Sequence, residues 1–179
     1  MLDVLGGRAD WSGSKAPVIF SHSSAYSICP HPRNVKDDIL KLVKERNSIV
    51  MVNVNPGFIS CVDVGNKNGL PEDDDANASL ERIVQHILHI GNLIGFDHVG
   101  IGTDFDGIAT VPKGFDDVTK YPDLIAALLR AGVSDHDAAK IAGHNLLRVW
   151  HEVDAVSARM KAQNAPIMED DVDLLTVEL

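Results

Sequence analysis

Cysteine is scarce in this sequence, and so are aromatic and basic residues. Two cysteines in 179 residues exclude a small scaffold built from several disulfides, and taken alone they indicate buried free thiols. Acidic residues outnumber lysine and arginine by 26 to 16, which gives a formal net charge of -10 at pH 7. Because nucleic acids and anionic membrane surfaces repel such a protein, we expect small molecules or proteins as its partners.

Long apolar runs are also absent. No stretch of about 18 apolar residues could span a bilayer, and residues 1–8 lack the basic segment and apolar core of an export signal. A cytoplasmic protein is therefore expected for the sequence as written, with membrane attachment only through segments that it does not contain. The apolar content of 45% is ordinary for one globular domain.

Two common catalytic motifs are missing as well. The pair Gly100 and Gly102 lacks the third glycine and the following helix of a dinucleotide-binding loop. No Gly-x-Ser-x-Gly motif occurs, which disfavours an enzyme that works through a covalent acyl intermediate.

Three apolar segments without polar alternation predict strands, at residues 18–21, 49–54 and 98–103. Segments of this kind suit a parallel sheet that is covered on both faces. Amphipathic patterns between and after them predict helices. This order of strands and helices favours an α/β fold with right-handed crossovers.

The predicted helices have recognisable starts. Asn34 is expected to be the N-cap of the first helix, and Ser134 with Asp137 has the spacing of a capping box for the last, which extends to about residue 160. The other helices are expected at residues 79–94 and at about 121–131.

Two histidines lie on the helix expected at residues 79–94. His86 and His89 are three residues apart and could bind a metal together, but they fall opposite the apolar stripe of the helix. Because that stripe packs outside the sheet, we expect structural or surface roles for both side chains.

Polar side chains follow two of the three predicted strands. His22 follows the first, and an imidazole there can bind zinc, although a lone histidine more often packs or lies at the surface. Asp104 follows the third, where it could act as a general acid and base or cap a turn before Gly107. Arg33, in the loop after the first strand, has a guanidinium suited to binding a carboxylate through two hydrogen bonds.

The sequence contains a series of short motifs, namely Ser21-His22-Ser-Ser-Ala-Tyr26 with Arg33-Asn34, Ser48-Ile-Val-Met-Val-Asn53, Phe58-Ile-Ser-Cys61, His98-Val-Gly-Ile-Gly-Thr-Asp104-Phe-Asp-Gly107, Lys120-Tyr-Pro-Asp-Leu-Ile125 and Asn145-Leu-Leu-Arg-Val149. In this order they resemble the membrane (renal-type) dipeptidases, a family of zinc peptidases. The resemblance spans most of the chain.

The resemblance implies a fold: the C-terminal βα units, about strands six to eight, of a (β/α)8 TIM barrel of the metal-dependent hydrolase type. A barrel needs eight strands and typically about 250 residues, so it is expected to be incomplete in this chain, and Met1 resembles an internal methionine of a longer protein. We expect a partial barrel domain over residues 1–162 and a C-terminal tail over residues 163–179. The alternative is an open three-stranded sheet with two exposed edges.

The resemblance also implies roles for individual residues. His22 would be a terminal ligand of one zinc ion in a two-zinc site, and Asp104 would touch the substrate and relay a proton from the attacking water to the leaving amine. Asp106 would be structural. Cys29 and Cys61 match the positions of a bridged pair in secreted members, so that a disulfide stands as an alternative to free thiols.

For the substrate, the resemblance implies that Arg33 grips the C-terminal carboxylate of a dipeptide. Asn55 and Phe58 could line the same pocket. The family often has tyrosine near these two positions, so the side chains that the enzyme prefers are not predicted.

The expected function is zinc-dependent hydrolysis of dipeptides. The family's site also needs a His-x-Asp pair, a bridging glutamate and a further histidine that the sequence lacks, and His22 alone falls short of the three protein ligands usual in hydrolytic zinc sites. We therefore expect low activity from the chain as given. The alternative is a noncatalytic module that associates through its sheet edges with another protein or as a homodimer.

Overall fold

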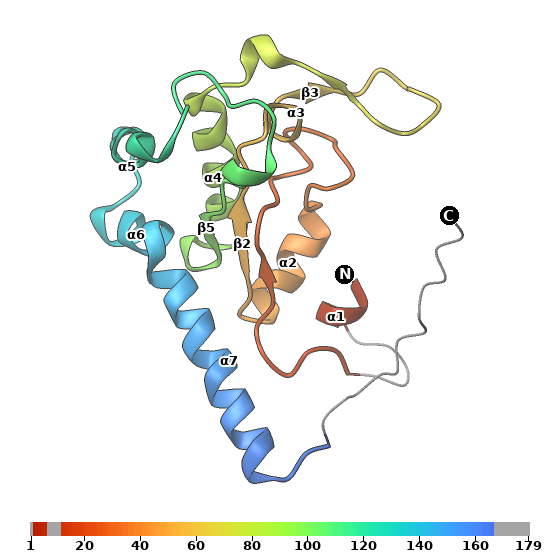
Figure 1. The fold of residues 1–179 in the computed structure, drawn as a ribbon, viewed down its shortest axis with the longest axis vertical. Coiled ribbons are helices and arrows are strands. Elements are labelled where there is room, and N and C mark those ends of the chain that lie inside the picture. The colour runs from red at the N-terminus through yellow and green to blue at the C-terminus, as the bar shows by residue number, and fades with distance from the viewer. Residues whose placement is uncertain (1, 7–11, 167–179) are drawn as a thin grey trace, which may run out of the picture.

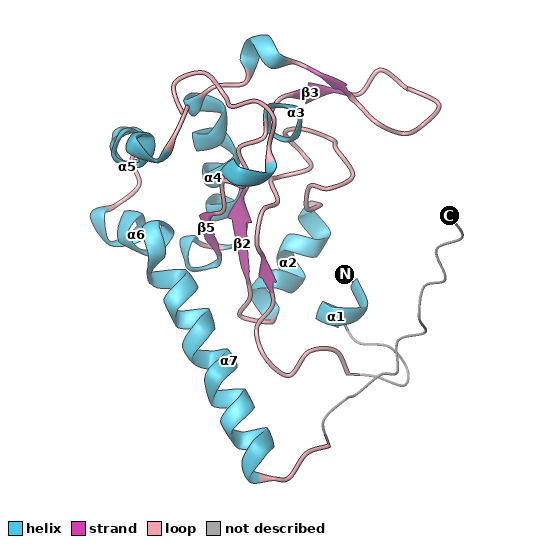
Figure 2. Cartoon of the chain, viewed as in Figure 1, coloured by secondary structure: helices cyan, strands magenta, loops and turns pink. Residues whose placement is uncertain are grey.

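A computed structural model describes residues 2–6 and 12–166 of the chain. At its centre is a parallel sheet with the strand order β1-β2-β5, formed by Ile19–Phe20, Ile49–Val52 and Val99–Ile101 (Figures 1 and 2). The three strands expected from the sequence and their parallel direction are confirmed. Each strand is shorter than expected, since β2 ends two residues early and β1 and β5 lose residues at both ends.

Helices precede, connect and follow the strands. They are α1 (Leu2–Gly6), α2 (Asp37–Glu45), α3 (Pro56–Ile59), α4 (Leu80–Ile94), α5 (Tyr121–Arg130), α6 (Asp135–Ala139) and α7 (Asn145–Ala162). A small antiparallel ribbon of β3 (Cys61–Val62) and β4 (Glu72–Asp73) stands beside α3, and the loop between its strands projects outward (Figure 1).

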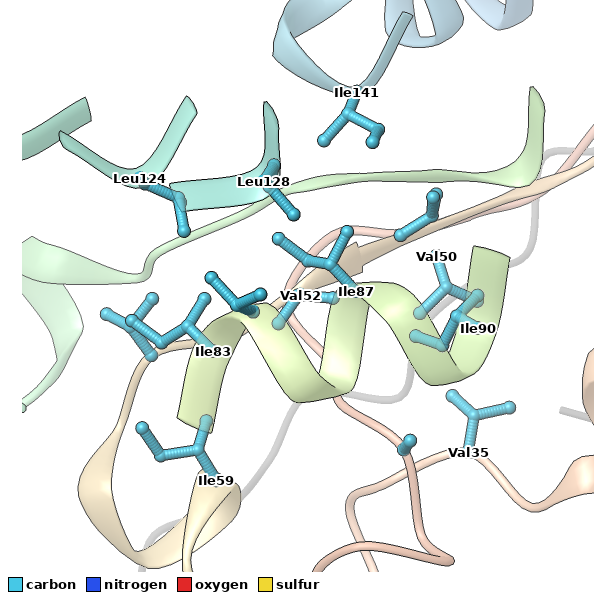
Figure 3. Close-up of a cluster of buried hydrophobic side chains, with 14 of the residues drawn as sticks. Val35, Val50, Val52, Ile59, Ile83, Ile87, Ile90, Leu124, Leu128 and Ile141 are labelled. Atoms are coloured by element: carbon cyan, nitrogen blue, oxygen red, sulfur yellow. The ribbon is translucent and has the colours of Figure 1, made fainter. Parts of the chain in front are cut away.

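The core forms around α4. Its apolar stripe is fully buried at Ile83, Ile87 and Ile90, and the helix contacts β2, β5, α2 and α5. Figure 3 shows these isoleucines together with their neighbours Val50 and Val52 of β2, Leu124 and Leu128 of α5, and Ile141. The spacing of the stripe places one face of the helix against the sheet, as the sequence predicts for residues 79–94.

Asn34 does not cap the first long helix, contrary to the prediction. α2 begins later, at Asp37, and the residue before it is extended and makes no side-chain cap. The buried side chain of Asn34 instead accepts a hydrogen bond from the backbone N–H of Ser24 and donates to the carbonyl oxygens of Cys29 and Phe58. These contacts occupy both its oxygen and its nitrogen, which leaves nothing to cap a helix.

His86 was expected on the polar side of its helix, and this placement is wrong. The side chain is fully buried. Its Nδ1 accepts a hydrogen bond from the backbone N–H of Ala25 at 3.0 Å, and its Nε2 donates to the carbonyl oxygen of Ile59 at 2.8 Å. A histidine can replace an apolar residue here because both ring nitrogens have backbone partners.

The C-terminal helical region starts as predicted. Ser134 Oγ accepts a hydrogen bond from the backbone N–H of Asp137 at 3.1 Å, which confirms the cap. A π-helical turn at Lys140–His144 separates α6 from α7, and α7 ends at Ala162. Most of the expected tail lies outside the described residues, so the boundary after residue 162 stays a prediction. Among the helices of residues 2–6 and 12–166, none has the length and apolar character needed to cross a bilayer.

Truncating the stripe of α4 should destabilise the fold. Ile87→Ala removes a fully buried side chain, and we expect it to lower the free energy of unfolding by about 2–5 kcal/mol. The matched control is Leu93→Ala on the same helix, where the side chain is 36% exposed. Urea denaturation measures both variants. Equal losses for both would contradict the packing described for α4.

His86 should make stability depend on pH. Burial lowers the pKa of His86 from 6.5 to about 4, so between these values the unfolded chain binds a proton that the folded chain does not. Stability is therefore full above about pH 6.5 and falls by about 3 kcal/mol as the pH drops to about 4. Burial also lowers the pKa of His31 and His98, which adds to the same slope.

The test is urea denaturation between pH 7 and pH 4, comparing wild type with His86→Gln. The variant should lose most of the slope, whereas His136→Gln, at an exposed position on α6, should keep it. An unchanged slope in His86→Gln would show that the folded protein accepts the proton on His86.

Candidate functional site

The carboxyl ends of the three parallel strands converge at Gly102. A Cβ atom at this position would overlap the carbonyl oxygen of Ser21, which follows β1. The backbone N–H of Gly102 donates to the carbonyl oxygen of Val52, and that of Ser23 donates to Met51 at 2.9 Å. The absence of a side chain at Gly102 thus allows the chain leaving β1 to cross the end of β2 and reach β5.

His22 and Arg33 are in direct contact at this end of the sheet. Arg33 Nη2 donates a hydrogen bond to His22 Nε2 at 3.0 Å. Because a guanidinium can only donate, Nε2 is the acceptor nitrogen, and the protonated Nδ1 faces the hydroxyl of Ser21 at 2.5 Å. The structure therefore brings together the residue expected to bind metal and the residue expected to bind the substrate carboxylate.

Arg33 also packs on an aromatic ring. Its guanidinium carbon lies 4.8 Å from the centroid of the Phe58 ring, and the ring of His31 lies 4.4 Å from the same centroid. His31 Nδ1 accepts a hydrogen bond from the backbone N–H of Arg33 at 3.2 Å. Burial, followed by the charge of Arg33, lowers the pKa of His31, so the neutral ring that this bond needs is favoured.

Sequence reasoning missed His31. Its contacts join the loop after β1 to α3, two segments that are distant along the chain, so no spacing pattern marks it. Its position two residues before Arg33 is the only local signal.

Asp104 sits in a polar turn after β5. Its backbone is left-handed, with φ of 62°, and its carbonyl oxygen accepts a hydrogen bond from Gly107 N–H. One oxygen of the carboxylate lies 3.4 Å from Asn53 Nδ2, and the side chain of Asn53 is fully buried. The turn and the amide together direct the carboxylate toward the end of β2.

Asn55 has a local role. Its side-chain oxygen accepts a hydrogen bond from Gly57 N–H at 3.0 Å and caps the short helix α3. Asn53 Oδ1 accepts from the backbone N–H of Asn55 at 2.5 Å. Since these contacts fix the turn that carries Phe58, Asn55 supports the position of that ring.

Two cavities open around these residues. The larger, of about 850 Å³, is lined by Ile19, Phe20, Ser21, His22, Ser23, Pro32, Arg33, Asn34, Val35, Lys36, Asp38 and Ile39. The smaller, of about 450 Å³, is lined by His31, Asn55, Gly57, Phe58, Asn66, Asn68, Leu70, Pro71 and Asp73. The expected site residues are thus divided: His22 and Arg33 line the first cavity, Asn55 and Phe58 line the second, and Asp104 lines neither.

The described part of the chain does not form a complete metal site. It contains no group of three or more histidine, cysteine, aspartate or glutamate side chains that could hold one ion. His22 supplies a single imidazole, and the Nε2 lone pair accepts a hydrogen bond from Arg33. A hydrolytic zinc ion usually has three protein ligands, so the residues present do not fit zinc by themselves.

A disulfide holds the two segments that carry the site. Cys29, in the loop after β1, is bonded to Cys61 at the start of β3, and their Cα atoms are 5.0 Å apart. Asn34 makes a second link between the same segments through the carbonyl oxygens of Cys29 and Phe58. Arg33 and Phe58 are therefore adjacent to residues that are themselves fixed.

The sequence of the chain is similar to those of curated dipeptidases. The chain is 48% identical over 165 residues to the dipeptidase aclJ of Aspergillus oryzae and 44% identical over 162 residues to the dipeptidase tcpJ of Claviceps purpurea. These alignments cover 92% and 90% of this chain but 36% and 35% of the relatives. The chain thus spans about a third of the length of the curated relatives that it matches.

The fold of the chain is also similar to those of solved metallopeptidase structures. The fold is similar to a metallopeptidase from Rhodobacter sphaeroides liganded with a phosphinate mimic of the dipeptide L-Ala-D-Ala, with a TM-score of 0.65, 30% identity, and coverage of 78% of this chain and 37% of that one. The probable dipeptidase PvdM from Pseudomonas aeruginosa gives a TM-score of 0.66 and 25% identity, covering 78% of this chain and 46% of that one.

The family assignment extends over most of the sequence. The model of the membrane dipeptidases (peptidase family M19) matches residues 1–164, a range that includes every candidate site residue considered above. On this match, the chain belongs to the membrane dipeptidase family.

Proposed function

We propose that this chain supplies the carboxylate-binding and proton-transfer side of the active site of a zinc-dependent dipeptidase. The observation that carries the proposal is that His22 and Asp104 follow β1 and β5 at the same edge of the parallel sheet, with Arg33 hydrogen-bonded to His22. The family and its named dipeptidase relatives favour dipeptides as substrates. No finding supports the alternative of a noncatalytic module.

We further propose that β1, β2 and β5 correspond to about the sixth to eighth strands of a (β/α)8 barrel. Three features support this: the sequential order of the parallel strands, helices along the connections, and the close approach to Gly102 of the chain that leaves β1. Within residues 2–6 and 12–166, β1 and β5 each pair with one neighbour only. Further strands at these edges would complete the sheet.

Arg33 is the group that binds the substrate in this proposal. Its guanidinium forms two parallel hydrogen bonds with a carboxylate, and the Phe58 ring beneath it holds the plane of the fork in one orientation. Anchoring this carboxylate favours short peptides with a free C-terminus, in keeping with the dipeptide substrates that the family favours.

Asp104 is the proton carrier in this proposal. Its carboxylate takes a proton from the attacking water and delivers it to the leaving amine, which is a general acid and base role. The amide of Asn53 orients one carboxylate oxygen, and the other oxygen would carry the proton.

Zinc is the metal that the family resemblance favours, but its remaining ligands must come from outside the described residues. His22 would contribute one of them. We therefore propose that the chain alone hydrolyses dipeptides poorly.

The direct test compares the purified chain with a chimera. The chimera joins the chain to the part of the Aspergillus oryzae relative that the chain does not match. With zinc present, we expect the chimera to hydrolyse L-Ala-D-Ala and the chain alone to lack at least about 99% of that activity. The described residues of the chain do not include the ligands that would hold the metal, and loss of a catalytic component typically costs about 100-fold or more. Equal activity of the two proteins would refute the proposal.

The chimera also tests the individual roles. Asp104→Asn should lower kcat about 100-fold or more because the proton carrier is lost, whereas Asp106→Asn, at a neighbouring exposed position, should change it little.

Arg33→Met should raise KM by about tenfold or more through loss of a charge-assisted pair. Arg46→Met is its control, since Arg46 bonds the backbone of Ser12. Steady-state kinetics that separate kcat from KM decide both assignments.

A further inference from the structure

Two polar side chains of α4 reach both segments that carry the candidate substrate residues. We name these segments the β1 loop, residues 21–34, and the α3 segment, residues 55–61. His86 links them directly: its Nδ1 accepts from Ala25 of the β1 loop, and its Nε2 donates to Ile59 of the α3 segment. The tautomer is fixed, because a backbone N–H must donate and a carbonyl oxygen must accept.

Arg82 makes the same link one turn earlier on α4. Its Nε donates to the carbonyl oxygen of Ile59 at 3.1 Å, and its Nη2 donates to that of Ile28 at 3.3 Å. The remaining nitrogen, Nη1, donates to Gln85 of the same helix at 2.8 Å. The carbonyl of Ile59 thus accepts hydrogen bonds from both Arg82 and His86.

These contacts are unusual for the face of α4 on which they occur. The fully buried isoleucines Ile83, Ile87 and Ile90 surround His86 along the helix, and burying a polar ring among them is unfavourable unless its nitrogens are bonded. An apolar residue could fill the same space, but it would leave the N–H of Ala25 and one hydrogen bond of Ile59 unsatisfied. The main contribution of His86 is therefore its hydrogen bonds to the two backbone segments, and not its packing in the core.

We propose that Arg82 and His86 are positioning residues, which hold the β1 loop against the α3 segment so that Arg33 stays over the ring of Phe58 whether or not Cys29 and Cys61 are bonded. The relevance of this arrangement to substrate binding rests on the proposed function. The positioning itself does not, because it is a property of the folded chain.

The side chains of α4 and the disulfide both join the β1 loop to the α3 segment. Cys29 lies between Ile28 and the Asn34 turn in the β1 loop, and Cys61 follows Ile59 by two residues. The covalent link and the hydrogen bonds from α4 thus join the same two segments within a few residues of each other. Asn34 makes a further link between these segments, through the carbonyl oxygens of Cys29 and Phe58. Loss of either the disulfide or an α4 contact should therefore leave Arg33 over Phe58, and loss of both should weaken this contact without abolishing it.

The experiment measures the contact between Arg33 and Phe58 by NMR in the full chain. Protons above an aromatic ring are displaced upfield, so the side-chain δ-proton shifts of Arg33 report the contact directly, and Arg33→Lys assigns them. The shifts are recorded with the disulfide oxidised and reduced. The proteins are wild type, His86→Leu and Arg82→Met, with His89→Leu as control, because His89 bonds Asp37 of α2 and neither site segment.

Wild type and the control should keep the upfield displacement in both redox states. His86→Leu and Arg82→Met should keep it when oxidised, and when reduced their population with Arg33 over the ring should fall about tenfold, as expected for lost hydrogen bonds to buried backbone groups. His86→Gln, which retains a donor and an acceptor, should recover part of it. Arg82→Met, at a half-buried position, carries the test if His86→Leu does not fold.

Two results would overturn the proposal. Loss of the displacement in reduced wild type would mean that the disulfide alone positions Arg33. Full retention in both reduced variants would mean that α4 has no part in it. The NMR shifts do not depend on hydrolysis. An inactive chimera together with the expected shifts would therefore refute the proposed function and leave the positioning intact.

Discussion

β1, β2 and β5 pair in parallel, and this pairing sets the positions of the residues that follow each strand. Parallel strands end at the same edge of a sheet, so whatever follows them is brought together there. His22, Asn53 and Asp104 follow the three strands in turn, and the close approach at Gly102 draws the outer two strand ends together. The same pairing requires helical crossovers, and the stripe of α4 covers the sheet that they create.

The elements that could be predicted from the sequence are those with a local cause. Strands such as Ile49–Val52 are apolar throughout, and the stripe of α4 repeats at helical spacing, so periodicity is enough to find them. Asn34 and His86 were misplaced for one common reason. Each is polar with a good local explanation, a cap or an exposed face, yet each is buried because backbone groups distant along the chain need its hydrogen bonds. Periodicity carries no information about such partners.

The site shows the same division. His22, Arg33 and Asp104 could be proposed from their places after strands and from the family's motifs. Two sets of contacts could not be predicted: the hydrogen bond between Arg33 and His22, and the packing of Arg33 and His31 against the Phe58 ring. Both depend on how the β1 loop folds back on α3. The disulfide between Cys29 and Cys61 depends on that same fold-back, and the residues alone left its formation open.

We have proposed that the described strand ends supply the substrate-binding side of the site but do not hold the metal alone. The zinc retained by the purified chain, after equilibration with a zinc buffer and removal of free ions, shows whether the chain holds the metal by itself. We expect the chain to retain far less than stoichiometric zinc, because among the described residues His22 is not joined by further metal ligands and its Nε2 contacts Arg33. Stoichiometric zinc that is lost in His22→Ala would contradict it, since the chain would then contain a complete metal site.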